Sequence, residues 1–242
     1  MGLGRGEDGS GKMSNESSKT RGIRPKNFAE TYLQGRVLDI GCGPDLIVPH
    51  AEPFDLEHGN AEEIAAIRPN GAYDAVCSSH CLEHMRDVPK ALRQWWALLR
   101  KGGYLIIVVP EENLYEQGAW PSLFNEDHKA TFTLGRRTTW SPVSYDLVEL
   151  VKNLEDAEII GSSIQDHSYD HSLRKNSIGS VGRLLFKMNL HLQKVFRSLF
   201  RGSESAVERA VSRAFWYCGM PIDQTAGLAL AQIQVVARKR PG

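Results

Sequence analysis

The segment Val37-Leu38-Asp39-Ile40-Gly41-Cys42-Gly43-Pro44 carries the strongest fold signal in this 242-residue chain. Its apolar residues predict a short buried strand, and its two glycines predict a tight turn directly after that strand. In open α/β sheets, ligands bind at the carboxyl ends of the parallel strands. The segment therefore predicts a ligand-binding loop at one edge of such a sheet.

Segments typical of strands and helices alternate along the rest of the chain. Further strands are predicted at 52–56, 73–78, 104–109, 157–164 and 228–237, and helices at 27–33, 61–67, 88–100 and 142–154. The run at 104–109 is continuously apolar, which is typical of a strand covered on both faces. The alternation predicts a doubly wound α/β fold.

The composition excludes several classes of protein. The chain has 29 Lys and Arg against 29 Asp and Glu, so its zero net charge gives no overall attraction to nucleic acid. No apolar run approaches the roughly 20 residues that span a bilayer, and no signal-peptide pattern precedes the domain, so we expect a cytoplasmic protein. The four cysteines form no C-x-x-C pair and are expected to be reduced thiols.

Two regions depart from the alternating pattern. Residues 1–26 are polar and predict a disordered tail before a domain at 27–242. Residues 172–219 predict a helical insertion before the last strand, in which 178–201 is amphipathic. Between His171 and Arg201 the chain has seven basic residues and no acidic one, namely Arg174, Lys175, Arg183, Lys187, Lys194, Arg197 and Arg201.

The basic amphipathic insertion is open to three interpretations. In the first, the insertion packs on its own domain or on a second subunit. In the second, it docks on the inner face of an anionic membrane. Nucleic-acid binding is the least favoured, because no recognised module accompanies the charge.

The glycine loop disfavours a dinucleotide. A nicotinamide cofactor prefers G-x-G-x-x-G, but Leu46 stands at the third glycine position. Asp39, on the strand itself, would repel a pyrophosphate and suits a cofactor with a cationic amino-acid end. A nicotinamide oxidoreductase is therefore kept only as a rival.

Three motifs resemble, in order, those of class I S-adenosylmethionine-dependent methyltransferases: VLDIGCG at 37–43, SSHCLEH at 78–84 and LRKGGYL at 99–105. The resemblance covers about residues 27–166 and resumes at 228–239. It is greatest to small methyltransferases encoded among bacterial surface-polysaccharide genes. It implies a mostly parallel, seven-stranded Rossmann-like sheet and S-adenosylmethionine as the methyl donor. It also implies O-methylation of a sugar or other small-molecule hydroxyl, including glycan- or lipid-linked ones.

The resemblance also assigns cofactor residues. Gly41 and Gly43 would contact the methionine part of the cofactor, and Asp55 would accept hydrogen bonds from the ribose. The full implied set is Asp39, Gly41, Cys42, Gly43, Asp55, Leu56, Asn60, Ala61, Ser79 and His80. Two departures from the family pattern stand out: Asp45 stands where a third glycine is common, and Asp39 to Asp55 followed at once by Asn60 leaves no room for a full helix between the second and third strands.

A hydroxyl acceptor has to lose its proton, which requires a general base or a metal ion. His80, Glu83 and His84 are spaced so that they share one face of a helix. Their spacing resembles that of metal-assisted ubiquinone-pathway O-methyltransferases, which have an acid in place of His80. A base, a metal site and a purely structural role at the sheet edge all remain open for these three residues.

The long segment 110–140 is rich in aromatic residues and predicts an acceptor-binding region. Within it His128 is the first choice for the general base, with His84 and His80 as the other candidates. Asp127 or Glu126 would orient His128. The predicted acceptor contacts are Tyr115, Trp120, Asn125, Asp127 and Asp170.

Besides the nicotinamide oxidoreductase, two rivals to O-methylation remain from the sequence. One is methylation of a carboxylate or other small molecule, which needs no strong base. The other is a non-catalytic methyltransferase-like subunit that binds a partner through its basic helix.

Overall fold

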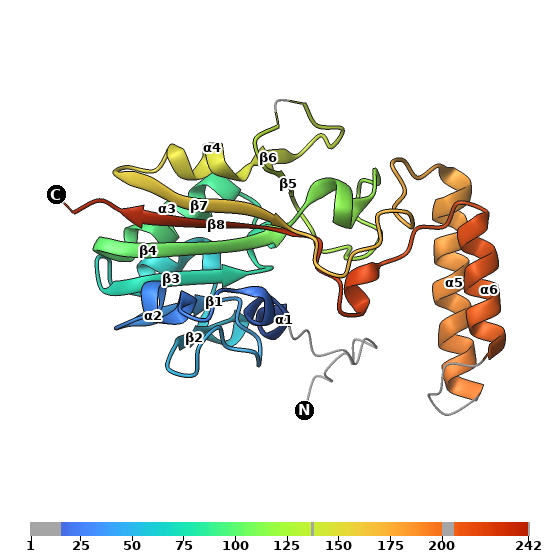
Figure 1. Cartoon of the computed structure of the whole chain (residues 1–242), viewed down its shortest axis with the longest axis horizontal. Coiled ribbons are helices and arrows are strands. Elements are labelled where there is room, and N and C mark those ends of the chain that lie inside the picture. The colour runs from blue at the N-terminus through green and yellow to red at the C-terminus, as the bar shows by residue number, and fades with distance from the viewer. Residues whose placement is uncertain (1–15, 137, 200–205, 242) are drawn as a thin grey trace, which may run out of the picture.

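The computed structural model describes residues 16–136, 138–199 and 206–241. Its centre is a six-stranded sheet in the order β2-β1-β3-β4-β8-β7, in which β8 runs antiparallel to both of its neighbours (Figure 1). The strands are β1 (Val37–Ile40), β2 (Glu52–Phe54), β3 (Tyr73–Ser79), β4 (Leu99–Pro110), β7 (Ala157–Gln165) and β8 (Gln232–Lys239). The mixed, mostly parallel α/β fold confirms the expected class.

The expectation of seven strands is wrong for the described part of the chain. The seventh strand was implied by the resemblance alone. Between β2 and β3, where a helix was predicted at 61–67, the chain forms two 3-10 helices, η1 (Leu56–His58) and η2 (Ala61–Ala66). The reason is local capping: the Asp55 carboxylate accepts from the backbone N–H of Leu56, and the Asn60 side chain accepts from that of Glu62. The short segment then reaches β3 without pairing at the sheet edge.

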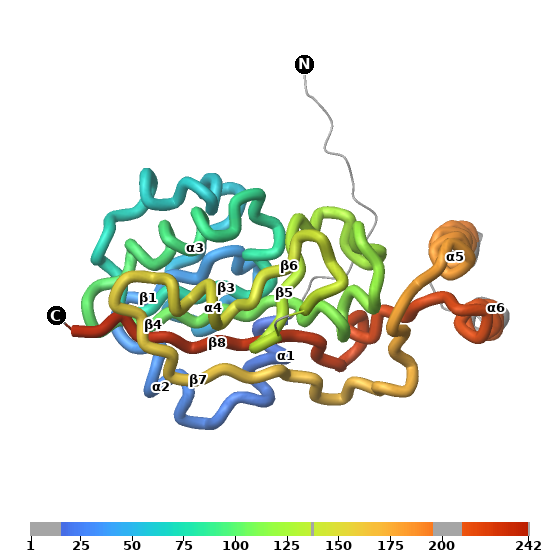
Figure 2. The backbone as a smooth tube through the Cα atoms, turned by 90° about the horizontal axis from the view of Figure 1, so that it is seen from above, coloured from blue at the N-terminus to red at the C-terminus, as the bar shows by residue number. Residues whose placement is uncertain are grey.

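Helices cover both faces of the sheet (Figure 2). On one face, α3 (Val88–Ala97) and α4 (Leu147–Lys152) bury an apolar core that includes Trp95 and Leu92. On the other face, α2 (Phe28–Tyr32) packs Phe28 onto β1, β3 and β4. The helix predicted at 142–154 is shorter than expected, because its first part forms β6 (Ser144–Asp146), paired with β5 (Thr131–Thr133).

The prediction of a disordered tail over 1–26 is wrong for its last part. Residues Glu16–Ile23 form helix α1, whose Thr20 is fully buried. Its polar side chains are hydrogen-bonded to distant loops: Ser18 Oγ donates to Asp45 at 2.6 Å and Lys19 Nζ to the Thr225 carbonyl at 2.7 Å. Residues 1–15 lie outside the described residues.

The insertion before the last strand forms two helices, α5 (Ser180–Leu199) and α6 (Ala206–Tyr217). They lie side by side as a hairpin that stands away from the sheet (Figures 1 and 2). A side chain at Gly182 would collide with the backbone of Gly219, so the two segments meet closely at their base. Arg201, at the end of the predicted amphipathic stretch, lies outside the described residues. No helix in the described part of the chain is long and apolar enough to cross a membrane.

Candidate active site

A cavity of about 310 Å³ lies at the carboxyl ends of β1, β2 and β3. Several predicted cofactor residues line it, namely Gly41, Asp55, Leu56, Asn60, Ala61 and His80. His84 and Asp127, predicted for the acceptor side, line it as well. The cavity therefore joins the glycine loop to the histidine motif.

The glycine loop is fixed by two aspartates. Asp39 is buried at the end of β1, and its carboxylate accepts from the backbone N–H of Ile47 at 2.7 Å. The Asp55 carboxylate accepts from the backbone N–H of Gly43 at 2.7 Å. Gly41 has a φ of 72°, and a Cβ there would lie 2.5 Å from the Cβ of Cys81, so only glycine fits.

Burial raises the pKa of the Asp39 carboxyl to about 6. The hydrogen bond from Ile47 and the positive charge of Arg24 oppose this rise and offset part of it. Asp39 does not line the cavity. It stabilises the loop through its hydrogen bond with the Ile47 backbone.

Asp55 and Leu56 stand together at the rim. The carboxylate of Asp55 accepts two backbone N–H groups, from Gly43 and Leu56, each at 2.7 Å. An ionised carboxylate has about four acceptor sites, so Asp55 retains capacity for hydroxyl donors. The side chain of Leu56 is 91% exposed and gives the rim an apolar surface for a flat ring.

At the other end of the cavity the lining residue His84 meets His128, which is buried behind the lining. Nδ1 of His84 lies 2.9 Å from Oδ2 of Asp127, and Nδ1 of His128 lies 2.8 Å from Oε1 of Glu116. Since an ionised carboxylate can only accept, both Nδ1 atoms carry hydrogen, and in the neutral form of each ring Nε2 has the lone pair. The centroids of the two imidazole rings are 5.1 Å apart.

Glu83 lies beside these two histidines, and we call Glu83, His84 and His128 the cluster. Glu83 is 1% exposed, and in the described structure neither of its carboxylate oxygens has a hydrogen-bond partner. Burial alone would raise the pKa of the Glu83 carboxyl, but the neighbouring imidazoles, His80 first, lower it below its usual range. The nearest of these, Nδ1 of His80, is 3.5 Å from Oε1.

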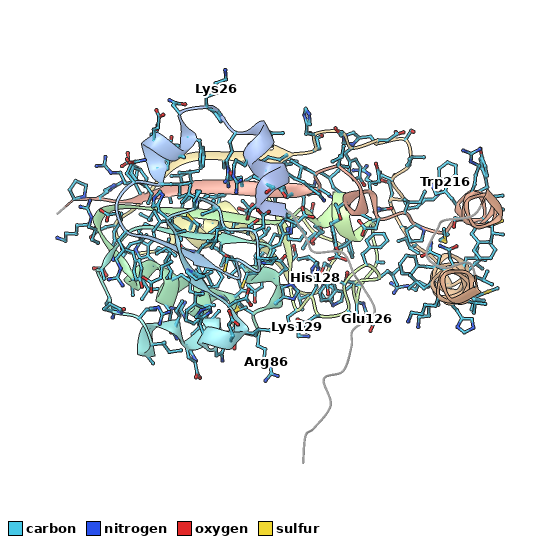
Figure 3. All side chains as sticks on the ribbon, turned by 90° about the horizontal axis from the view of Figure 1, so that it is seen from below. Lys26, Arg86, Glu126, His128, Lys129 and Trp216 are labelled. Carbon is cyan, nitrogen blue, oxygen red and sulfur yellow. The ribbon has the colours of Figure 1, made fainter. Side chains whose placement is uncertain are left out.

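The expected orienting residue of His128 was wrong. Asp127 holds His84 instead, and Glu126 is exposed on the surface, whereas His128 is buried (Figure 3). The partner is Glu116, at the end of the helical turn Glu112–Glu116 that follows β4. No periodicity links positions twelve residues apart across a loop, so the sequence contained no signal for this pair.

The remaining predicted residues fall into two groups. Tyr115 packs on the ring of His128 at 5.2 Å, and Asn125 accepts the backbone N–H of Asp127, so both shape the acceptor end. Neither of these two is among the described lining residues of the cavity, and the same holds for Cys42, Gly43, Ser79, Trp120 and Asp170. The Asp170 carboxylate accepts hydrogen bonds from the backbone N–H and the hydroxyl of Ser172, and the Trp120 carbonyl accepts one from the Arg183 side chain.

His80 has a left-handed backbone conformation, with a φ of 54°. Its Nε2 lies 2.9 Å from the side-chain oxygen of Gln232 on β8. His80 lines the cavity. Its side chain is held in place by the hydrogen bond with Gln232 at the start of β8.

Comparison with known proteins gives one family. The family model described as a methyltransferase domain matches residues 16–140, more than half of the chain. An uncharacterised methyltransferase of Mycobacterium bovis is 27% identical over 108 residues, which cover 35% of this chain and 55% of that protein. An uncharacterised methyltransferase of Mycobacterium tuberculosis matches to the same extent. The chain thus spans about half the length of these curated relatives.

Solved structures of similar topology include two proteins. A SAM-dependent methyltransferase from Archaeoglobus fulgidus is 16% identical with a TM-score of 0.49, covering 93% of this chain and 95% of that one. Phosphoethanolamine N-methyltransferase 2 of Haemonchus contortus, in complex with S-adenosyl-L-methionine, is 12% identical with a TM-score of 0.45. That match covers 96% of this chain and 53% of the other.

Proposed function

Because this chain belongs to the class I S-adenosylmethionine-dependent methyltransferases, we propose that it transfers the methyl group to a hydroxyl oxygen of a sugar or other small molecule. Glycan-linked and lipid-linked hydroxyls belong to the same proposal. The cofactor supplies a methyl group on a positively charged sulfur, and the protein has to bind it and to activate the acceptor.

The residues of the cavity fit this cofactor. The Asp55 carboxylate retains acceptor capacity for a ribose hydroxyl, and the exposed Leu56 offers an apolar surface to the adenine.

The histidine pair is the observation that carries the choice of acceptor. A carboxylate acceptor is already ionised, whereas a hydroxyl needs a base or a Lewis acid. Each of the two imidazoles is held at Nδ1 by a carboxylate, and His84 lines the cavity itself. This arrangement places imidazole nitrogens at the acceptor end that can either accept a proton or hold a Lewis-acid cation, and methylation of a carboxylate requires neither.

The proposed reaction forms an O–CH₃ bond and breaks the S–CH₃ bond, whose electron pair returns to sulfur. The acceptor proton leaves through the cluster to solvent. Chain residues contribute mainly by placing the two reacting atoms in line, since a displacement at a sulfonium carbon needs no covalent intermediate.

The test is a product analysis with a matched variant. Sugars, nucleotide sugars and lipid-linked glycans are supplied with isotopically labelled S-adenosylmethionine, and the product bond is identified by its stability in alkali, where methyl ethers survive and methyl esters do not. His84→Gln is expected to lower turnover by about 10²-fold or more while donor binding is unchanged.

The control is His171→Gln. His171 also pairs with a carboxylate, Asp166 at 2.9 Å, but it is exposed and outside the cavity, so its turnover should match the parent. Alkali-labile product, or a His84→Gln variant as active as the parent, would contradict O-methylation through this cluster.

A further inference from the structure

Glu83, His84 and His128 form a compact group of metal-binding side chains. One ligand atom from each lies within 4.8 Å of the other two. The first two come from the turn after β3, and the third comes from the loop before β5. Their meeting is a product of the fold, because 44 residues separate His84 from His128.

Both histidines have the second hydrogen bond that metal-binding histidines usually make. Such residues donate their other ring N–H to a carboxylate or carbonyl, which fixes the ring and its tautomer. Here Asp127 takes the Nδ1–H of His84 and Glu116 that of His128. In the neutral form of each ring, Nε2 is then the nitrogen that can bind a cation.

Glu83 provides a separate indication. Its carboxylate is almost fully buried, and no described group donates a hydrogen bond to either of its oxygens. A buried carboxylate is costly unless a cation neutralises it, and the ion-pair partner of Glu83 in the described structure is the imidazole of His80. The contact with Nδ1 of His80, at 3.5 Å, is too long for an ordinary hydrogen bond.

We propose that Glu83, His84 and His128 bind a divalent transition-metal cation of the Zn²⁺ type. Two imidazoles and one carboxylate suit Zn²⁺ and its first-row neighbours, whereas Mg²⁺ prefers oxygen ligands. Three protein ligands leave a coordination position open toward the cavity, where an acceptor oxygen can bind. A cation there lowers the pKa of a coordinated hydroxyl, and the proton passes to solvent water.

The role of the cation in methyl transfer rests on the proposed function, but the binding of the cation does not. Cation binding is therefore tested first, in the absence of an acceptor. The full-length protein is freed of metal with a chelator and titrated with Zn²⁺ by calorimetry and with Co²⁺ by visible absorption. One equivalent should bind, and Co²⁺ should give the intense bands of a low-symmetry nitrogen and oxygen site. A wild-type protein that binds no cation at this stoichiometry would overturn the site.

Variants locate the cation. Glu83→Gln and His128→Gln should weaken Zn²⁺ binding about 100-fold or more, and Asp127→Asn, which disturbs only the orientation of His84, about 10- to 100-fold. His171→Gln, outside the cluster, should bind as the parent does. Unchanged binding in Glu83→Gln would overturn the assignment, and the Co²⁺ spectrum of the wild type still decides if a variant does not fold.

Activity then separates the two proposals. Full hydroxyl methylation by the metal-free protein would overturn the role of the cation and leave O-methylation standing. Cation binding at these residues without hydroxyl methylation under any acceptor tested would overturn the proposed function and leave the metal site standing.

The α5–α6 hairpin carries a second inference from independent observations. Apolar side chains recur along one side of α5 at intervals of three, four and seven residues and are exposed, namely Val181 (64%), Leu184 (59%), Met188 (45%) and Val195 (41%). The hairpin stands away from the sheet, and its inner end is held where Trp216 of α6 donates to the Leu173 carbonyl (Figure 3). This apolar stripe is therefore not covered by the described part of the protein.

The charge beside the stripe indicates what covers it. Lys187 and Lys194 are exposed next to it, and 171–201 contains no acidic residue. A second copy would bring like charges together, whereas an anionic lipid surface matches both the apolar stripe and the positive charge. We infer that α5 lies on an anionic membrane surface.

Vesicle co-sedimentation tests this surface. The full chain should bind vesicles of phosphatidylcholine with phosphatidylglycerol and not those of phosphatidylcholine alone. The double variant Lys187→Gln, Lys194→Gln should bind the anionic vesicles about 10-fold more weakly or worse, while Arg93→Gln, on α3, should bind as the parent does. Equal binding to both vesicles, no binding, or a dimer that the apolar substitution Leu184→Ser dissolves would overturn the inference.

Discussion

The two ends of the cavity are held together by different kinds of contact. At the cofactor end, the carboxylates of Asp39 and Asp55 accept backbone N–H groups of the loops that form the wall. At the acceptor end, the carboxylates of Glu116 and Asp127 hold the imidazoles of other side chains. Substitutions at the cofactor end should therefore change the backbone conformation of the loops and the affinity for the methyl donor. Substitutions at the acceptor end should change turnover and leave donor affinity unchanged.

The largest effect is expected at the cofactor end, from Gly41→Ala. A Cβ at φ 72° is strained and would lie 2.5 Å from Cys81, so we expect the free energy of unfolding to fall by about 2–5 kcal/mol, with loss of donor binding. Denaturant unfolding measures the change.

The matched control is Gly43→Ala. Gly43 also has a positive φ, of 52°, but its added Cβ meets no atom within 4 Å, so only the left-handed strain of about 1–2 kcal/mol applies. Equal losses for the two variants would show that the contact with Cys81 is not what requires glycine.

A pH dependence comes next in size. The carboxyl of Asp39 has a pKa of about 6 in the folded protein against 3.8 as the ordinary value, so between these two the folded state binds more protons than the unfolded state. The contribution of Asp39 to stability is thus fully present below pH 4 and is lost as the pH rises through 6, by about 2–3 kcal/mol.

Asp39→Asn tests this assignment, because asparagine keeps an oxygen for the N–H of Ile47 and does not titrate. Relative to the parent, the variant should gain about 2–3 kcal/mol in unfolding free energy between pH 4 and pH 7. Parallel stability curves for the two proteins would contradict the raised pKa.

A smaller effect is expected at the acceptor end, from Glu116→Gln. The amide can present its NH₂ group to Nδ1 of His128 and so lose control of the tautomer, which should lower turnover about 10- to 100-fold with the donor affinity unchanged. Steady-state kinetics with calorimetric donor binding separates these quantities.

Glu126→Gln is its control and the smallest expected effect. Glu126 is exposed and the described structure gives it no contact with His128, so the variant should match the parent in turnover. A loss at Glu126 with none at Glu116 would reverse the assignment of the orienting residue.

The two ends also differ in how far they could be predicted from the sequence. At the cofactor end, Asp39 and Gly41 belong to one strand and the loop directly after it, and the pattern predicted both. Asp55, which follows β2 and fixes the same loop, was assigned only by the resemblance to methyltransferases. Contacts over a few residues leave a pattern in the chain, such as a buried strand followed by glycines.

The acceptor end shows the limit of such patterns. His128 meets Glu116 and Glu83 only because the loop after β4 folds back over the turn after β3, and nothing in the spacing of these residues indicates it. Helix α1 was missed for a related reason, since Ser18 and Lys19 are polar by composition but make hydrogen bonds to distant loops.

Calorimetric titration with S-adenosylhomocysteine tests the separation of the two ends most directly, because it needs no acceptor. Asp55→Asn should bind at least about 10-fold more weakly than the parent, since the amide cannot accept both the Gly43 N–H and ribose hydroxyls. His84→Gln should bind as tightly as the parent. Equal weakening in both variants, or weakening in His84→Gln alone, would contradict the account of one cavity with a backbone-built donor end and a side-chain-built acceptor end.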